Sequence, residues 1–325
     1  GDGVSSNVLV TGGAGFIGSH ICQRLLDRGD AVICLDSFEP DYDPALKRSN
    51  IAALTERAGF DLIEGDIRDK SLLDHVAKTR RIEAVMHLAA RTGVRSSMTS
   101  PAAYADVNFH GTAQILEMAR DYSIENFIFA SSSSVYGDRT ETPFKESDSV
   151  DQPASPYAAT KSAGELLCNS FNQIFGINIS CLRYFTVYGP RQRPGMAIHR
   201  FCSLIMQGKP VSMYGDGSSE RDYTYIDDIV DGTLLALERC SGFEIFNLGN
   251  HHGIRLDELI EEIGRSCGVE YSIERQPEHP GDVSRTCACL EKSRARLGYE
   301  PKVSITEGLD RFVNWFSSQN QTSIC

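Results

Sequence analysis

Residues 7 to 18 read NVLVTGGAGFIG, a short apolar run followed by a turn that has glycine at every third position, Gly12, Gly15 and Gly18. The apolar run is typical of a buried strand, and the residues up to about Arg28 predict a helix that begins inside the turn. In such a unit Gly12 permits the tight turn, Gly15 lets a ligand approach the backbone, and Gly18 lets the helix pack on the sheet. The free N–H groups at the start of the helix then favour a bound phosphate.

The second apolar run indicates which dinucleotide would bind. AVICLD, residues 31 to 36, ends in Asp36, eighteen residues after Gly18. A carboxylate there can accept hydrogen bonds from both ribose hydroxyls and repels a 2′-phosphate, so we expect NAD rather than NADP. Asp66 and Ile67, at the end of the next run DLIEGDI, are expected to flank the adenine. The alternative is a glycine-rich turn beside a solvated aspartate.

Strand-like and helix-like segments continue to alternate along the chain. They are a strand near 82–89, a helix over 101–120 and a strand over 126–134. This alternation predicts the α/β class, with a Rossmann doubly wound parallel sheet and a smaller C-terminal α/β substrate domain. With 325 residues the chain is long enough for both. The expected division is an NAD-binding domain over 1–185, rejoined by about 222–250, and a substrate-binding domain over 186–221 and 251–325.

Composition restricts the possible partners and the location. The formal net charge of −12 argues against nucleic acid or an anionic membrane surface as partner. The chain has no apolar run of about 18 residues and no signal-peptide pattern, so we expect a cytoplasmic protein. Its ten cysteines contain no CxxC pair. We therefore expect buried reduced thiols, with neither a disulfide framework nor a metal site.

The residues that indicate chemistry are Tyr157 and Lys161, in the run YAATK. Four positions apart, they share one helix face, although an exposed helix pair is the alternative for these two taken alone. Lowering the pKa of a tyrosine from about 10 to about 7 requires roughly 4 kcal/mol, which we expect Lys161 and the positive nicotinamide of oxidised NAD to supply. The run ASSSSVYG offers hydroxyls as proton partners, and Ser132 and Ser134 are both candidates. Together these features predict a hydride-transfer enzyme.

Two stretches carry arginine without any acidic residue. Residues 183 to 200 contain four arginines, and residues 84 to 100 contain Arg91 and Arg95. In a chain of net negative charge, such stretches can hold an anionic substrate. Solvated surface arginines are the alternative.

These motifs resemble those of the extended short-chain dehydrogenase/reductases that act on nucleotide sugars. The resembling segments are TGGAGFIGSH at 11–20, HLAA at 87–90, DVNFHGT at 106–112, SSSSVYG at 131–137, YAATK at 157–161 and RDYTYIDD at 221–228. Within that superfamily, LRYFTVYGPRQRPGMA at 182–197 is most similar to the UDP-glucuronate 4-epimerases.

The resemblance implies a tightly held NAD, a C-terminal domain that grips UDP, and a homodimer built from the helices over 101–120 and 157–175. It assigns the cofactor to Gly12, Gly15, Phe16, Ile17, Gly18, Asp36, Asp66, Ile67, Leu88, Ala89, Ala90, Asn108, Tyr157 and Lys161. It assigns the substrate to Arg95, Thr186, Arg193, Arg221 and Asp282, with Arg221 on the pyrophosphate and Asp282 on the ribose. A purely structural ion pair is the alternative for Arg221.

A few positions separate the subfamilies. The 4,6-dehydratases usually carry Asp-Glu before VYG and the UDP-glucuronate decarboxylases a Glu, whereas this chain has Ser133 and Ser134. UDP-glucose 4-epimerases typically have Asn where this chain has Thr186. Thr186, followed seven residues later by Arg193, matches the pair that the glucuronate epimerases use on the sugar carboxylate. The chain departs from the pattern at Gly195, where an Asp is common, and at TCACL, residues 286 to 290, which lacks an expected Asp.

The resemblance therefore implies an NAD-dependent 4-epimerase that interconverts UDP-glucuronate and UDP-galacturonate through a 4-keto intermediate, with decarboxylation suppressed. The alternatives are a UDP-glucose or UDP-N-acetylglucosamine 4-epimerase and a catalytically silent NAD-binding sensor.

Overall fold

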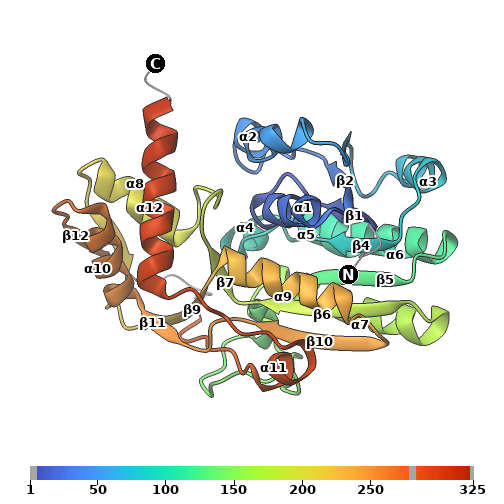
Figure 1. Cartoon of the computed structure of the whole chain (residues 1–325). Helices are drawn as coiled ribbons and strands as arrows, with labels where there is room; N and C mark the ends of the chain where they lie inside the picture. Colours follow the sequence, from blue (N-terminus) through green and yellow to red (C-terminus); the bar gives the residue numbers. More distant parts are fainter. Residues whose placement is uncertain (1–5, 278–282, 323–325) are drawn as a thin grey trace.

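The computed structural model describes residues 6–277 and 283–322, which form a larger and a smaller lobe (Figure 1). The larger lobe contains a seven-stranded parallel sheet with the strand order β10-β6-β5-β4-β1-β2-β3. Its strands are β1 (Asn7–Thr11), β2 (Ala31–Asp36), β3 (Phe60–Glu64), β4 (Ala84–His87), β5 (Asn126–Ser132), β6 (Asn178–Tyr184) and β10 (Phe243–Leu248). The order reverses between β1 and β4, which is the doubly wound Rossmann arrangement, so the predicted fold class is confirmed.

The first turn folds as the glycine spacing predicts. Helix α1 (Phe16–Arg28) begins directly after Gly15. Gly12 has a φ of +69°, in the left-handed region that favours glycine. A Cβ added to Gly18 would lie 2.1 Å from the carbonyl oxygen of Gly12. Glycine at position 18 therefore lets α1 approach the turn closely enough to pack on the sheet.

Helices cover both faces of the large sheet (Figure 1). On one face lie α1, α2 (Pro44–Thr55) and α9 (Ile226–Glu238), and on the other α3 (Lys70–Thr79), α6 (Gly111–Asp121) and α7 (Pro156–Phe175). Their apolar side chains form two core clusters, one with Ile21 and Leu25 of α1 and one with Ile115 and Leu116 of α6. Burial on both faces explains why the strands read as nearly continuous apolar runs.

The segment expected as one helix over 101–120 is interrupted by a wide turn. It consists of α5 (Pro101–Ala105), the π-helical turn η1 (Asp106–His110) and α6, and it is preceded by α4 (Val94–Thr99). The wide turn contains Asn108, which is buried and holds the backbone of Arg91 through two hydrogen bonds of 2.8 and 2.9 Å. The interruption thus presents an inward-facing amide to the loop after β4.

The smaller lobe contains a three-stranded sheet in the order β11-β9-β7 and a parallel β12-β8 pair. Its elements are β7 (Thr186–Tyr188), α8 (Ala197–Met206), β8 (Val211–Tyr214), β9 (Glu220–Tyr225), β11 (Gly253–Arg255), α10 (Leu256–Cys267), β12 (Ile273–Gln276) and α12 (Ile305–Thr322). The short helices η2 (Ser133–Tyr136) and α11 (Glu291–Leu297) complete the described structure. After β9 the chain returns through α9 to the large sheet, where β10 pairs with β6. The division into two domains at the stated boundaries stays a prediction.

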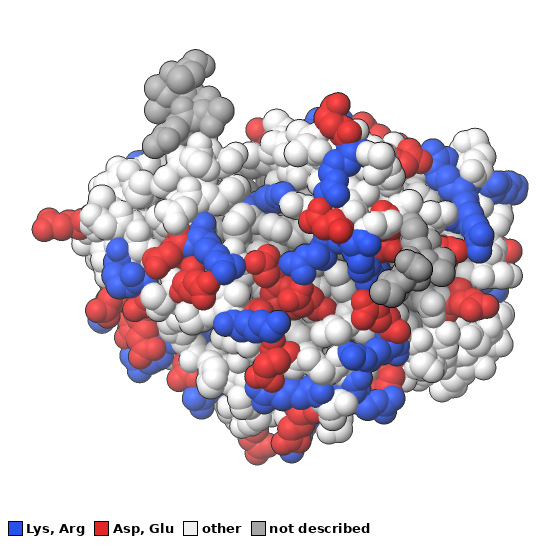
Figure 2. All heavy atoms as spheres, in the orientation of Figure 1, with Lys and Arg blue, Asp and Glu red and all other residues white. Residues whose placement is uncertain are grey.

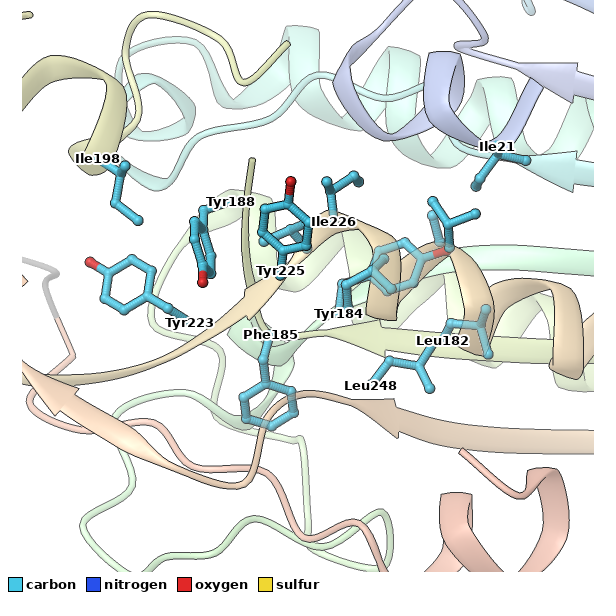
Figure 3. Packing of buried hydrophobic residues seen from close by; sticks show 14 of the residues in the cluster. Ile21, Leu182, Tyr184, Phe185, Tyr188, Ile198, Tyr223, Tyr225, Ile226 and Leu248 are labelled. Carbon is cyan, nitrogen blue, oxygen red and sulfur yellow. The ribbon is translucent and has the colours of Figure 1, made fainter. Parts of the chain in front are cut away.

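Buried aromatic residues pack where β6 continues into β7 (Figure 3). Tyr188 of β7 lies edge-on to Tyr223 and Tyr225 of β9, with ring centroids 6.3 and 5.5 Å apart. Such edge-to-face pairs favour one relative position of the two strands. The packing therefore fixes the strand that carries Thr186.

The composition led to expectations about the charge of the protein and the state of its cysteines. On the face that Figure 2 shows, basic and acidic side chains lie interspersed.

All nine cysteines in the described ranges are free, and each is buried or half-buried. Within residues 6–277 and 283–322, no helix is both long and apolar enough to cross a membrane.

The close approach at Gly18 gives a stability prediction. Gly18→Ala should lower the free energy of unfolding by about 3 kcal/mol, because the methyl group would overlap the Gly12 carbonyl and separate α1 from the turn. Gly195→Ala is the control, since a Cβ there would meet nothing within 4 Å. Chemical denaturation followed by circular dichroism measures both variants, and equal stabilities would contradict the packing described for α1.

Candidate active site

A cleft of about 450 Å³ opens at the carboxyl ends of the parallel strands. It lies where the strand order reverses between β1 and β4, the place where doubly wound sheets bind ligands. Most of the predicted site residues line this cleft. They are Gly12, Gly15, Phe16, Ile17, Gly18, Asp36, Asp66, Ile67, Leu88, Ala89, Ala90, Ser132, Ser134, Tyr157, Lys161, Thr186 and Arg193.

Four predicted residues are not part of this wall. Asn108 lies behind it, where it holds the backbone of Arg91 and also donates to the hydroxyl of Thr160 at 3.0 Å. The guanidinium carbon of Arg95 lies 4.8 Å from the ring centroid of Tyr214. Arg221 lines a second, smaller cavity. Asp282 lies outside the described residues.

The second cavity has a volume of about 120 Å³ and adjoins the main cleft. Val94, Ser133 and Ser134 line both spaces. Arg221 and Thr286 lie in the wall of the smaller one. The two cavities together therefore form one elongated site that extends from the large sheet toward the smaller lobe.

The end of the cleft near β1 and β2 fits a dinucleotide. Gly15 precedes α1 without any side-chain cap, so the first N–H groups of the helix remain available to a phosphate. The Asp36 carboxylate accepts hydrogen bonds from the backbone N–H groups of Ala14, at 3.0 Å, and Phe38, at 2.8 Å. Both bonds hold the carboxylate in one orientation at the end of β2. Asp36 thereby lines the cleft at the end of β2.

Helix α7 places the tyrosine and the lysine together. Ser155 caps the helix by accepting a hydrogen bond from the Ala158 N–H at 3.1 Å, which fixes where the first turn begins. Tyr157 then lies in the first turn and Lys161 one turn later on the same face. The Lys161 Nζ lies 5.9 Å from the Tyr157 ring centroid and donates to the carbonyl oxygen of Ala130 at 2.7 Å.

The electrostatics of the pair differ from the sequence-based expectation. Burial raises the pKa of Tyr157, while a hydrogen bond with Ser132 and the charge of Arg193 lower it less strongly. Burial also lowers the pKa of Lys161 to about 8. We expected Lys161 to help bring the phenol toward neutral pH, but desolvation disfavours both charged forms and the ammonium is directed to a backbone carbonyl. The protein groups alone therefore leave the phenol protonated at neutral pH.

The serine run forms a line of hydroxyls next to the phenol. The Ser132 hydroxyl lowers the pKa of the Tyr157 phenol and donates to the Ser134 hydroxyl at 3.0 Å. The backbone N–H of Ser134 also donates to the Ser132 hydroxyl at 3.1 Å. Ser132 is therefore the serine that acts on the phenol, and Ser134 is hydrogen-bonded to Ser132.

The two residues expected at a sugar carboxylate both line the cleft, Thr186 directly after β6 and Arg193 in the segment that follows β7. Thr186 is half-buried in β7, and the Arg193 guanidinium donates to the carbonyl oxygen of Thr92 at 3.4 Å. Within the described part of the chain, no carboxylate lies within 4.0 Å of that guanidinium. The positive charge of Arg193 is thus directed into the cleft without an intramolecular counter-ion.

Two groups near the site were not identified from the sequence. Tyr104 of α5 lies edge-on to Tyr157, with ring centroids 6.4 Å apart, and its hydroxyl donates to the Thr92 carbonyl at 2.8 Å. Behind α7, Glu165 and Arg183 form a buried ion pair of 2.7 Å. In the sequence, neither group differs from ordinary core residues or surface charges. Only the tertiary contacts reveal them.

Metal ligands are a separate question. Across residues 6–277 and 283–322, no group of three or more His, Cys, Asp or Glu side chains is arranged to hold a metal ion.

Comparison with known proteins identifies the family. The model of the NAD dependent epimerase/dehydratase family matches residues 8–249. The UDP-glucuronate 4-epimerase of Thermodesulfobacterium geofontis is 42% identical over 308 residues, which cover 94% of this chain and 95% of that protein. The crystal structure of UDP-glucuronic acid 4-epimerase from Bacillus cereus, in complex with UDP-glucuronic acid and NAD, has a TM-score of 0.89 and 37% identity, covering 96% of this chain and 99% of that one.

A UDP-glucose 4-epimerase from Thermotoga maritima, solved with UDP-glucose, has a TM-score of 0.88 and 34% identity, covering 97% of this chain and 99% of that one. Because these comparisons cover nearly the whole chain, the similarity includes both lobes. The chain therefore belongs to the NAD dependent epimerase/dehydratase family.

Proposed function

We propose that the protein is an NAD-dependent 4-epimerase that interconverts UDP-glucuronate and UDP-galacturonate through a 4-keto sugar. The observation that carries the proposal is the position of Arg193, which directs an unneutralised guanidinium into the cleft that contains Tyr157. The named activities of the Thermodesulfobacterium and Bacillus relatives support the same substrate.

The residues that would hold NAD line the part of the cleft next to β1, β2 and β4. We assign the pyrophosphate to the glycine turn and α1, the adenosine ribose to Asp36, and the adenine to Asp66 and Ile67. When bound, NAD accepts a hydride from C4 of the sugar and returns it to the opposite face, so the reaction needs no second redox substrate. Asn108 would support this site indirectly, through the Arg91 backbone.

The proton transfer is assigned to the hydroxyl groups at the end of β5. Tyr157 would accept the proton of the sugar 4-hydroxyl, with Ser132 as its direct partner and Ser134 behind it. Lys161 would stabilise the phenolate by its charge, and its bond to the Ala130 carbonyl holds it in place. Because burial raises the pKa of Tyr157, the positive nicotinamide ring of oxidised NAD is a necessary contribution to this step.

The carboxylate of the sugar creates a hazard that the cleft must control. Oxidation at C4 makes a β-keto acid, which can lose carbon dioxide by dispersing the carboxylate charge into the ring. An arginine can bind a carboxylate through two parallel hydrogen bonds and so stabilises the localised charge. We therefore assign suppression of decarboxylation to Arg193, with the Thr186 hydroxyl fixing the torsion of the group.

The nucleotide end is assigned to the smaller cavity. Arg221 would contact the pyrophosphate of UDP there, and Arg95 would contribute positive charge beside Tyr214. Asp282, assigned to the ribose by family resemblance, lies outside the described residues. A UDP-sugar would thus extend from the smaller lobe to the cleft.

Direct measurement of products tests the proposed function. Purified protein is incubated separately with UDP-glucuronate, UDP-glucose and UDP-N-acetylglucosamine, without added NAD, and products are identified by NMR. We expect UDP-galacturonate from the first substrate. Conversion of the neutral sugars only would indicate a UDP-glucose or UDP-N-acetylglucosamine 4-epimerase. Release of UDP-pentose and carbon dioxide would indicate a decarboxylase, and absence of turnover with retained NAD would indicate a sensor.

Tyr157→Phe should abolish epimerisation, because the phenol oxygen that accepts the substrate proton is removed while the ring remains. NAD should stay bound, since the contacts assigned to its pyrophosphate and ribose are unchanged. Turnover by NMR and the NAD content of the denatured protein measure the two effects. A variant that retains most of the wild-type rate would exclude Tyr157 as the proton acceptor.

Arg193→Ala should weaken UDP-glucuronate by about 2 kcal/mol or more, about 30-fold in Kd, because the carboxylate loses its charged partner in a desolvated site. The affinity for UDP, which has no sugar carboxylate, serves as the internal control and should not change. Isothermal titration calorimetry measures both ligands. An unchanged Kd for UDP-glucuronate would remove Arg193 from the substrate site.

We further propose a homodimer that forms through α7 and the helical segment that consists of α5, η1 and α6. Leu166 and Ile174 of α7 are 72% and 69% exposed, and Phe109 of η1 is also exposed. Large apolar side chains that remain this exposed on adjacent helices are typical of an interface between subunits. This is the pair of helical segments that the family resemblance assigns to the dimer.

The double variant Leu166→Arg, Ile174→Arg should be monomeric, because two charges would be buried without partners in each half of the interface. Val269→Arg is the control, since Val269 is similarly apolar and exposed but follows α10 in the smaller lobe. Light scattering after size exclusion measures the molar mass of each. A monomeric wild type, or a dimeric double variant, would contradict the proposed interface.

A cytoplasmic location is also proposed. Its support is that the described cysteines are all free, which is consistent with a reducing compartment.

A further inference from the structure

We propose that Arg191, together with Gln23 and His20 of α1, holds Arg193 in position over the cleft and thereby determines the affinity for the acidic sugar. The inference deepens the proposed function and rests on the role assigned there to Arg193. Arg191 is in this view a positioning residue, because it acts on the substrate through Arg193.

The segment concerned, residues 189 to 193, is the first part of the connection from β7 to α8. Arg193 lines the cleft, whereas residues 189 to 192 do not contribute to its wall. The Arg193 side chain has one hydrogen bond to the described protein, the 3.4 Å contact with the Thr92 carbonyl. A single long bond fixes a flexible side chain weakly, so the position of its guanidinium depends on the backbone that precedes it.

The first anchor of the segment is His20. Its Nε2 lies 2.8 Å from the carbonyl oxygen of Pro190. Burial and the nearby charge of Arg191 lower the pKa of His20 to about 4, so the ring is neutral at pH 7. A carbonyl can only accept, which places the single ring proton on Nε2. His20 also lies edge-on to Phe16, a residue of the cleft wall, with ring centroids 5.9 Å apart.

The second anchor is Arg191 itself. Its Nη2 donates to the Gln23 side-chain oxygen at 2.7 Å, and its Nη1 lies 3.4 Å from the Ser19 hydroxyl. Its backbone has a φ of +68°, a conformation that a non-glycine residue keeps when the surrounding contacts hold it. Within the described residues no carboxylate pairs with this half-buried guanidinium. The side chain is therefore bound to α1 by neutral partners alone.

The third anchor is Gln192, which is buried. Its Nε2 donates to the carbonyl oxygen of Val187 at 3.2 Å, so the segment is also tied back to β7. Three consecutive residues before Arg193 are thus fixed, two of them to α1. Because the same helix begins at the glycine turn, one element positions both the dinucleotide cradle and the arginine for the sugar carboxylate.

The removal of one anchor gives the central test. Arg191→Met keeps an unbranched side chain of similar stem length but removes the guanidinium and its hydrogen bonds to α1. We expect the Kd for UDP-glucuronate to rise about tenfold, the effect of losing hydrogen bonds made by a charged group, while the Kd for UDP and the NAD content stay unchanged. Gln23→Leu should have the same effect. Gln23→Glu should preserve wild-type affinity, because a carboxylate can accept from Arg191 in the same place.

Two further comparisons separate positioning from general damage. In the Arg193→Ala background, Arg191→Met should cause no additional loss, because the group through which it acts is gone. Arg24→Met is the control on the same helix. Arg24 pairs with Asp231 of α9, and its loss should not affect the acidic sugar.

The outcomes distinguish this inference from the proposed function. If Arg193→Ala weakens UDP-glucuronate but Arg191→Met does not, or if the two losses are additive, the positioning role is wrong and the function stands. Equal losses for UDP and UDP-glucuronate in Arg191→Met would also overturn the positioning role, since the damage would then be general. If Arg193→Ala itself leaves UDP-glucuronate affinity unchanged, both the carboxylate assignment and the positioning role are wrong.

Discussion

Desolvation is the constraint on which the chemistry of this cleft depends. A phenol and an ammonium lie one helical turn apart in a site where burial disfavours both of their charged forms, and their pKa values move in opposite directions. The Ser132 hydroxyl and the charge of Arg193 oppose the effect of burial on the pKa of Tyr157, and Cys168 and Glu165 oppose it for Lys161. In the proposed reaction Tyr157 therefore needs further positive charge to act as a base, and we propose that the oxidised cofactor supplies it.

The scaffold around these groups is held largely by bonds to the backbone. Asn108, in the π-helical turn η1, is hydrogen-bonded to the backbone of Arg91 in the loop after β4. The Tyr104 hydroxyl donates to the Thr92 carbonyl of the same loop. Behind α7, Glu165 accepts from Ser131 at 2.5 Å and pairs with the buried Arg183, which ties the helix to the ends of β5 and β6. Removing one partner of such a buried ion pair is strongly destabilising, because the other charge is left buried without a partner. The pair therefore keeps this wall of the site rigid.

The sequence predicted the parts of the site that follow from local geometry. The glycine spacing, the acidic end of β2 and the Tyr157–Lys161 separation each depend on a regular strand or helix, and the structure brings these residues together in one cleft. Contacts between distant segments were not predictable in this way. Nothing in the sequence indicates that Arg191 reaches α1, that Asn108 holds a loop, or that the ammonium of Lys161 is directed to Ala130. The direction in which the protein groups shift the pKa of Tyr157 was not predictable for the same reason, because burial is a property of the tertiary structure. That Lys161 and the nicotinamide together lower this pKa stays a prediction.

An isotope measurement tests the central claim, that C4 of a uronic acid is oxidised and reduced again inside one closed site. The substrate is UDP-glucuronate with deuterium at C4, incubated in ordinary water without added NAD. The account predicts UDP-galacturonate that retains the deuterium at C4. Product that has lost the label to solvent, or a labelled UDP-pentose formed with carbon dioxide, would contradict it.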